Sequence, residues 1–150
     1  MNTHHRNARR GTVAALAALT AGVLSLAGAG TAGAESATAA ETHPIASSVL
    51  GEDYKLTLTA ERGTADDYTA SVRLRVYTHS GGAWRQSDSA LVGEPEGWFW
   101  YPLTGKGAVC RFSTSSSEPA PIEISLLRTP SLGCSEPQHF TLEEGTLHAG

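Results

Sequence analysis

The alternation of apolar and polar side chains in residues 68–78, YTASVRLRVYT, is the strongest constraint on how this chain can fold. Every second position from Ala70 to Val76 is apolar, and the positions between them are polar. A period of two residues is that of a β-strand. One packed face and one wet face are typical of an antiparallel sheet, so this segment predicts a strand with one side in a core.

Six further segments carry shorter strand signals, and turn residues separate them. We expect these strands at residues 53–60, 83–92, 98–101, 109–114, 122–126 and 139–142. Asp88 interrupts one of them, which predicts a β-bulge or an edge position there. Seven short strands without a helical period predict an all-β fold, an antiparallel β-sandwich. A small closed β-barrel is the alternative.

The N-terminal residues have the order of an export signal. Three arginines without an acidic residue precede an apolar run, and Ala32-Gly33-Ala34 supplies small residues for cleavage. We therefore predict a signal peptide at residues 1–34, by the general secretory or the twin-arginine route. The mature protein is expected to be secreted and extracellular, without membrane insertion after cleavage. Residues 35–50 lack a hydrophobic period and predict a flexible leader to a single β-domain at residues 51–150.

The expected mature chain is acidic. Three of the eleven Lys and Arg residues lie in residues 1–34, and all fifteen Asp and Glu residues lie beyond Ala34, which gives 8 − 15 = −7 for residues 35–150. Nucleic acid and anionic lipid repel a domain of this charge, so we expect neither as a partner.

Cys110 and Cys134 are the only cysteines in the sequence. An even number of cysteines in an exported chain predicts a disulfide bond. A zinc site would need further ligands at metal spacing, and the histidines do not supply them.

The sequence WFWY is the feature most suggestive of function. Trp98 and Trp100 share one face of an expected strand, and Phe99 and Tyr101 share the other. We expect the two tryptophans to be mainly core, since large apolar rings gain most from burial, and one of them to pack on the disulfide as in immunoglobulin-type sandwiches. Tyr101 and Trp84 are expected at the surface. A ligand surface for a protein or a sugar ring would draw on these aromatic residues, Trp84, Trp98, Trp100 and Tyr101.

We identify no catalytic, cofactor-binding or metal-binding residues. The sequence has no nucleophile elbow, no phosphate loop and no histidine pair at ligand spacing. The leading hypothesis is a secreted non-enzymatic domain that binds an extracellular protein or glycan without a cofactor. The alternatives are a small secreted hydrolase and a structural cell-surface protein. Exposed aromatic residues would favour binding, whereas a pocket holding His79 or His139 beside a carboxylate and a serine would favour an enzyme.

The segments GWFWYPLTGKGAVC and PSLGCS, with the Ala/Gly-rich signal, resemble those of uncharacterised small secreted proteins of actinomycetes. This resemblance implies secretion and a small β-domain, and it implies no activity. Secreted protease inhibitors of the subtilisin-inhibitor type are similar in size, but they typically carry two disulfides, and this chain can form one.

Overall fold

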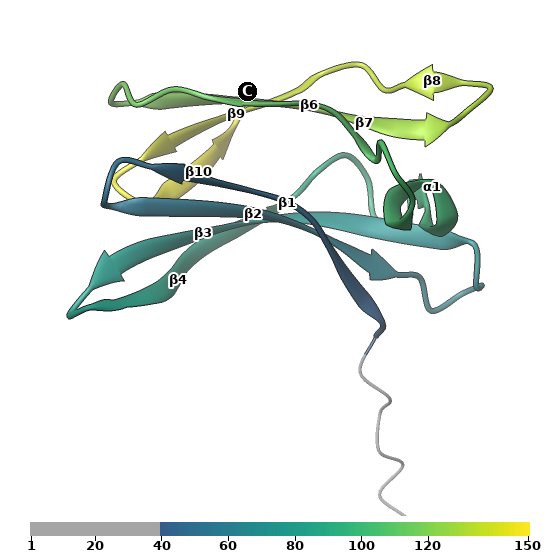
Figure 1. Ribbon diagram of the computed structural model, residues 1–150, viewed down its shortest axis with the longest axis horizontal. Coiled ribbons are helices and arrows are strands. Elements are labelled where there is room, and N and C mark those ends of the chain that lie inside the picture. Colours follow the sequence, from purple (N-terminus) through teal and green to yellow (C-terminus); the bar gives the residue numbers. More distant parts are fainter. Residues whose placement is uncertain (1–39) are drawn as a thin grey trace, which may run out of the picture. The chain divides into compact units, whose positions relative to one another are not determined.

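The computed structural model describes residues 40–150, in which two antiparallel sheets pack face to face (Figure 1). The first sheet has the strand order β1-β2-β3-β4 with β5 paired to β3, and the second has the order β10-β9-β7-β6 with β8 paired to β7. The elements are β1 (Thr42–Leu50), β2 (Tyr54–Arg62), β3 (Thr69–Ser80), β4 (Ala83–Leu91), β5 (Trp98–Phe99), α1 (Trp100–Thr104), β6 (Val109–Thr114), β7 (Ala120–Thr129), β8 (Gly133–Cys134), β9 (Gln138–Glu143) and β10 (Thr146–Ala149). The predicted antiparallel β-sandwich is confirmed, and the two sheets do not close into a barrel.

Most paired strands in each sheet are consecutive in the chain, and the exceptions are β5, which pairs with β3, and β9, which pairs with β7. The first sheet is built from β1 to β5 and the second from β6 to β10, so the chain passes between them once, through α1 and the turn after it. Immunoglobulin-type sandwiches interleave their two sheets through Greek-key connections, which residues 40–150 do not contain. The two halves of the sandwich are therefore successive halves of the sequence.

The core lies between the sheets and follows the alternation of the sequence. Every second side chain of β2 and β3 is buried, and every second side chain of β7 faces them. The large side chains that are fully buried are Leu56, Leu58, Leu74, Leu103, Ile122, Ile124, Leu126, Leu142, Val72, Val76 and Val92. Full burial of one such side chain contributes about 1.5–3 kcal/mol. This interior is therefore the main source of stability.

Residues 42–50 correct one expectation, because they form strand β1 and not part of a flexible leader. They pair with β2 from Thr42 opposite Glu61 to Leu50 opposite Tyr54. Small and polar side chains hid the strand from a hydrophobicity pattern. An edge strand is held largely by backbone hydrogen bonds, which such side chains make as well as apolar ones do. The predicted signal peptide, residues 1–34, and residues 35–39 lie outside the described residues.

The expected four-residue aromatic strand is also corrected. Pairing with β3 ends after Phe99, and the chain turns at once into α1, which starts at Trp100 and contains Pro102. Proline is tolerated in the first turn of a helix, where its missing N–H has no partner to lose. Helix α1 lies at one end of the sandwich between the layers (Figure 1). No helix in residues 40–150 has the length and apolar character that a membrane span requires.

The bulge predicted near Asp88 is confirmed. Val76 pairs with Asp88 and Tyr77 with Gln86, which leaves Ser87 as the extra residue in β4. Its hydroxyl donates a hydrogen bond of 2.8 Å to the carbonyl oxygen of Gly145, in the turn between β9 and β10. The bulge thus ties an edge of the first sheet to the second sheet. Strands β8 and β10 were not predicted, since each is short and lacks an alternating pattern.

Candidate binding surface

The four aromatic residues predicted to contribute to a ligand surface occupy two environments. Trp98 and Trp100 are each 5% exposed, whereas Tyr101 is 59% and Trp84 38% exposed. The indole nitrogen of Trp98 donates a hydrogen bond of 2.7 Å to the buried carbonyl of Val92. The two tryptophans therefore belong to the core, as expected, and only Tyr101 and Trp84 remain accessible to a ligand.

Tyr101 and Trp84 do not form one patch, which corrects the idea that Trp84 extends it. Trp84 pairs with His79 at one end of β3, with ring centroids 4.8 Å apart. Tyr101 lies against Tyr68, which precedes the other end of the same strand. His79 lies eleven residues after Tyr68 along β3, which corresponds to about 35 Å in an extended strand.

Tyr101 instead belongs to an aromatic cluster that the sequence analysis recognised in part. We call Tyr68, Phe99 and Tyr101 the aromatic end. Tyr68 is 67% exposed, its ring centroid lies 6.1 Å from that of Tyr101, and Phe99 is 44% exposed opposite Thr69. The exposure of Tyr68 was not predicted, because its position directly before the alternating segment suggested that it belongs to the strand. The polar Asp66-Asp67 pair directly before it indicates a loop, and this pair could have predicted the exposure of Tyr68.

Backbone and carboxylate contacts fix the position of Tyr68. The Asp66 carboxylate accepts hydrogen bonds from the backbone N–H groups of Tyr68 and Thr69 at 2.7 and 2.8 Å. These bonds stabilise the charged carboxylate and lower the pKa of Asp66. The carbonyl of Tyr68 accepts a bond of 2.7 Å from the N–H of Trp100, which joins this loop to α1. The aromatic end therefore has an ordered base.

Arg62 supports the same region from the neighbouring strand. Its guanidinium donates to the Glu41 carboxylate at 2.6 Å and to the carbonyl of Asp67 at 3.1 and 3.2 Å. The bond with Glu41 is the main reason that the pKa of Arg62 is raised. The guanidinium carbon also lies 5.4 Å from the ring centre of Trp100, within cation–π distance. The partly exposed side chain of Arg62 thus connects Glu41, at the start of the described residues, to Trp100 beneath the aromatic end.

The outer face of the second sheet carries a serine, a carboxylate and a histidine, the residue types of a serine hydrolase. Ser113, Glu123 and His139 lie opposite one another on β6, β7 and β9 and line a hollow of about 430 Å³. This is the composition that we associated with an enzyme. The order across the strands is serine, glutamate, histidine, however, so β7 separates the serine from its base by about 10 Å. A serine nucleophile needs the histidine next to it, and Glu123 instead pairs with Arg111 at 2.9 Å.

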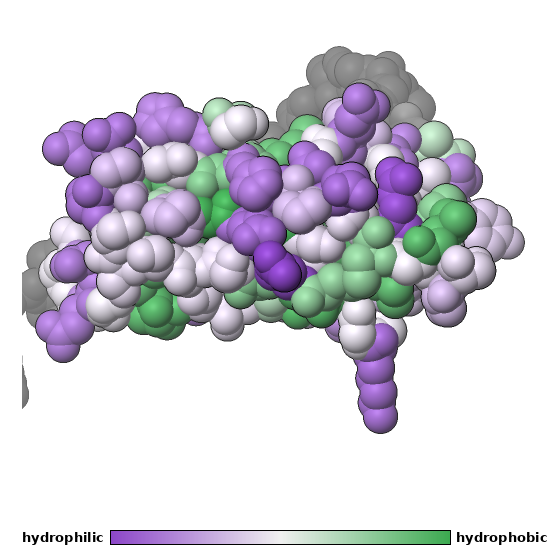
Figure 2. Space-filling model, turned by 90° about the horizontal axis from the view of Figure 1, so that it is seen from above, coloured by the Kyte–Doolittle hydropathy of each residue, from purple (hydrophilic) through white to green (hydrophobic). Residues whose placement is uncertain are grey.

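The rest of this outer face shows no concentrated site. Seen from the side of the second sheet, polar residues predominate, and hydrophobic ones occur in separate small areas (Figure 2). Within residues 40–150, no group of three or more His, Cys, Asp or Glu residues is placed to hold a metal ion.

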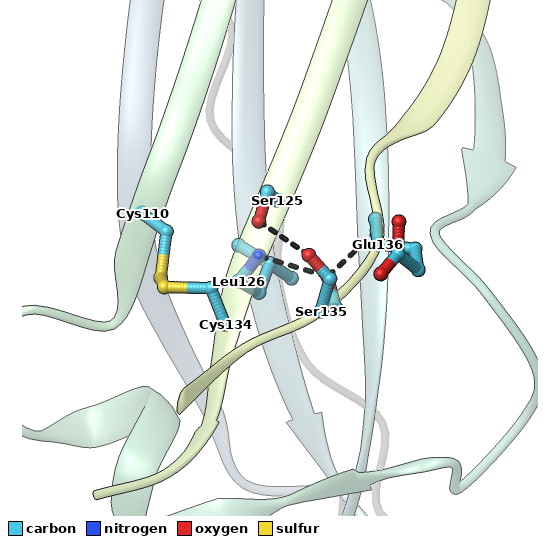
Figure 3. The surroundings of a disulfide bond; sticks show 6 residues. All are labelled: Cys110, Ser125, Leu126, Cys134, Ser135 and Glu136. Atoms are coloured by element: carbon cyan, nitrogen blue, oxygen red, sulfur yellow. Dashed lines mark hydrogen bonds between the residues drawn. A yellow bond between two sulfur atoms is a disulfide. The ribbon is translucent and has the colours of Figure 1, made fainter. Parts of the chain in front are cut away.

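The predicted disulfide between Cys110 and Cys134 is present, with Cα atoms 6.1 Å apart. It joins β6 to β8, two strands that each pair with β7, and it lies on the exposed surface (Figure 3). The expectation of a buried bridge against a tryptophan is therefore wrong. Beside it, Ser125 donates a hydrogen bond of 2.8 Å to the carbonyl of Ser135, and the Ser135 hydroxyl accepts one of 3.2 Å from the N–H of Leu126.

Comparisons with protein-family models, with curated proteins and with solved structures found no match to this chain. Its function must therefore be argued from the residues and their geometry.

Proposed function

We propose that this chain is exported and that its β-domain binds an extracellular protein or glycan without catalysing a reaction. The observation that carries the proposal is the aromatic end, in which the exposed rings of Tyr68 and Tyr101 lie 6.1 Å apart on an ordered base and Phe99, on the adjoining strand, is exposed as well. Exposed aromatic groups of this kind are typical of surfaces that bind sugar rings or protein partners.

The pattern of residues 1–34 and the disulfide support the exported location, since disulfides persist in oxidising compartments. The ordering of Tyr68 through Asp66 and Trp100 supports a role in binding. A side chain whose base is already fixed loses less conformational freedom when it meets a partner. Tyrosine suits such a surface because its ring contributes apolar area while its hydroxyl stays hydrated.

The test is capture of exported proteins and polysaccharides with the purified protein, followed by calorimetry on the captured partner. Tyr68→Ala combined with Tyr101→Ala should weaken binding at least about tenfold, because aromatic residues are common hot spots. Trp84→Ala is the matched control, since it removes an exposed ring at the far end of β3. Unchanged affinity in the double variant, or an equal loss in the control, would refute the aromatic end as the contact.

A further inference from the structure

The outer face of the first sheet carries positive charge on an otherwise acidic chain. The side chains of Lys55, Arg73, Arg75 and Tyr77 lie on this face and are partly exposed, and we call them the basic sheet face. They share it with the acid Glu61, and a second acid, Glu96, lies at the end of this face, where its N–H donates to the Ser71 hydroxyl. The ammonium nitrogen of Lys55 also lies 6.0 Å from the ring centre of Tyr77.

The basic sheet face borders a hollow of about 520 Å³. This hollow is lined by Pro44, Ile45, Ala46, Ser47, Lys55, Thr57, Thr59 and Tyr77. Thr57 lies opposite Arg75 in the β2–β3 pairing, and Thr59 lies opposite Arg73, so the two arginines adjoin the hollow while their guanidinium groups reach toward Glu61. Hydroxyl groups and the Lys55 ammonium therefore line one open depression, with the arginine cluster beside it.

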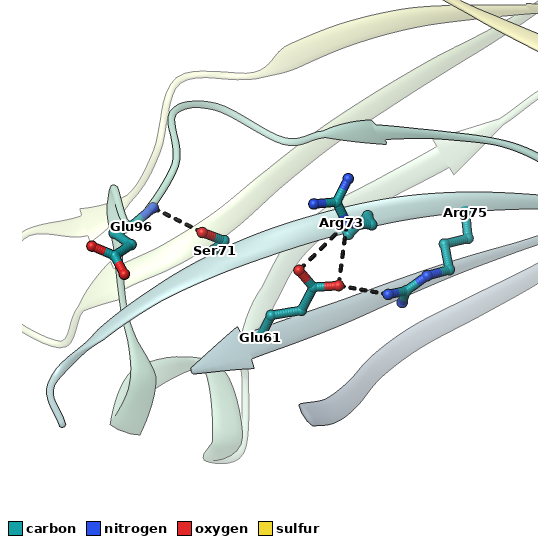
Figure 4. A network of polar contacts seen from close by, with 5 residues as sticks. All are labelled: Glu61, Ser71, Arg73, Arg75 and Glu96. Atoms are coloured by element: carbon teal, nitrogen blue, oxygen red, sulfur yellow. Dashed lines mark hydrogen bonds and ion pairs between the residues drawn. The ribbon is translucent and has the colours of Figure 1, made fainter. Parts of the chain in front are cut away.

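Glu61 holds the two arginines in place. The Nε atom of Arg73 donates to the Glu61 carboxylate at 3.2 and 3.4 Å, and Nη2 of Arg75 donates to the same group at 2.5 Å (Figure 4). The two terminal nitrogens of Arg73 turn away from Glu61 in this view and donate to no side chain or carbonyl in residues 40–150. One carboxylate faces two guanidinium groups, so the cluster keeps one positive charge, and Lys55 adds another.

We propose that the basic sheet face binds a carboxylated polysaccharide, a chain that contains uronic acid residues. The carboxylate of one sugar is held by the two free nitrogens of Arg73, whose fork geometry matches it. Neighbouring sugars lie in the hollow, with their hydroxyls on Thr57 and Thr59 and a ring against Tyr77. The site goes beyond the proposed function, because it uses residues away from the aromatic end.

Two observations favour a glycan over an acidic protein on this face. Its lining offers the hydroxyls of Ser47, Thr57 and Thr59 and one partly exposed aromatic ring, that of Tyr77, and its other apolar residues, Pro44, Ile45 and Ala46, are aliphatic. Cores of protein interfaces are depleted in lysine and serine and enriched in apolar and aromatic groups. The charge favours a carboxylated chain over a neutral one, since a face with net positive charge attracts anions.

The experiment measures the affinity of the purified protein for polygalacturonate by calorimetry, with the fully methyl-esterified polymer as the matched neutral ligand. We expect binding to polygalacturonate that weakens with salt, and at least about tenfold weaker binding to the ester. Arg73→Gln should lower the affinity about tenfold, because a charge-assisted bidentate contact is lost. Lys55→Gln, which leaves the contacts of Glu61 in place, should lower it about threefold.

Arg111→Gln is the control, since it removes the same charge from the opposite sheet. Unchanged affinity in that variant, and in the double variant of the aromatic end, supports the site. An equal loss in Arg111→Gln, equal binding of the ester, or no binding of polygalacturonate would overturn it. Binding of polyglutamate in place of the polysaccharide would also overturn it, by assigning the face to an acidic protein.

Discussion

The two sheets of this sandwich are held together in different ways. In the first, β2 and β3 pair without a register shift from Tyr54 opposite Thr78 to Arg62 opposite Ala70. In the second, two pairings of β7 contain a register shift. The pairing with β6 has an extra residue in β6, Cys110, and the pairing with β8 has an extra residue in β7, Arg128. The disulfide joins β6 to β8, the two strands whose pairing with β7 contains these shifts. The edge strands of the first sheet have register shifts as well, at Ile45 in β1 and at Ser87 in β4, so the difference is that the central pair of the first sheet is continuous and the shifts in the second sheet lie beside a disulfide.

The same difference extends to the outer faces. The uninterrupted β2–β3 ladder of the first sheet sets Glu61, Arg73 and Arg75 at regular spacing, so that one carboxylate reaches both guanidinium groups. On the second sheet, the disulfide and the hydrogen bonds of Ser125 and Ser135 occupy the corresponding surface with structural contacts. The outer face of β2 and β3 is thus left available for binding, whereas the outer face around β7 is used for stability.

The largest expected effect is that of Trp100→Ala, which tests whether the two sheets unfold together. Trp100 is buried at the start of α1, and this helix contacts both β2 and β7. Its loss should lower the free energy of unfolding by about 3–5 kcal/mol, as large core truncations do. Denaturant unfolding should show one transition at a lower midpoint, and Tyr101→Ala should cost less than about 1 kcal/mol. Two separated transitions would mean that the sheets are independent units.

Reduction of the disulfide tests the difference between the sheets directly. The two cysteines are 24 residues apart, and closing a loop of this size contributes about 3.5 kcal/mol in the chain-entropy model. Hydrogen exchange should show that amides of β6 and β8 lose more protection than amides of β2 and β3 when the bond is reduced. Equal loss in both sheets would contradict a local role for the bond.

A smaller effect is expected from Ser125→Ala. Ser125 is buried in β7, and its hydroxyl donates to the carbonyl of Ser135 beside the disulfide. Loss of this bond should cost about 1 kcal/mol in thermal or denaturant unfolding. Ser71→Ala is the matched control in the first sheet, where the hydroxyl accepts a bond from the N–H of Glu96. If Ser71→Ala costs more, the second sheet is not the one that depends on side-chain contacts.

The smallest expected effect concerns acid and the loop before β3. The pKa of Asp66 is lowered from 3.8, first by the N–H of Thr69 and then by that of Tyr68. A group with a lowered pKa contributes its full stabilisation above its unfolded value and loses it as the pH falls through the folded value. The amide resonances of Tyr68 and Thr69 should therefore titrate with a midpoint below 3.8, and Asp66→Ala should remove that titration. A midpoint at or above 3.8 would show that these bonds do not form.

Sequence patterns predicted the parts of the fold that depend on side-chain polarity. The alternation from Ala70 to Val76 predicted a core strand. The larger ring of tryptophan predicted that Trp100 is buried, whereas Tyr101 was expected at the surface. Strand β1 was missed because small side chains such as Ala46 carry no periodic signal, although their backbones pair as well as any others.

The candidate surfaces could be predicted only in part, since they depend on register. Glu61 lies near Arg73 and Arg75 only because β2 and β3 pair as they do, and spacing along one strand does not reveal a partner on the next. The same holds for Ser113, Glu123 and His139, which meet across three strands but are far apart in the sequence.

The chain crosses from the first sheet to the second once, so a single cut in this connection would separate the two sheets. Lys106 is exposed in the turn between α1 and β6, so trypsin cleavage after it would cut no strand and break no strand pairing in residues 40–150. The N-terminal fragment would keep the first sheet, and the C-terminal fragment would keep the second sheet with both cysteines. The two fragments would be held together by the apolar interface and by a few hydrogen bonds, such as that of Ser87 with Gly145, which is the arrangement that fragment complementation and split reporters require.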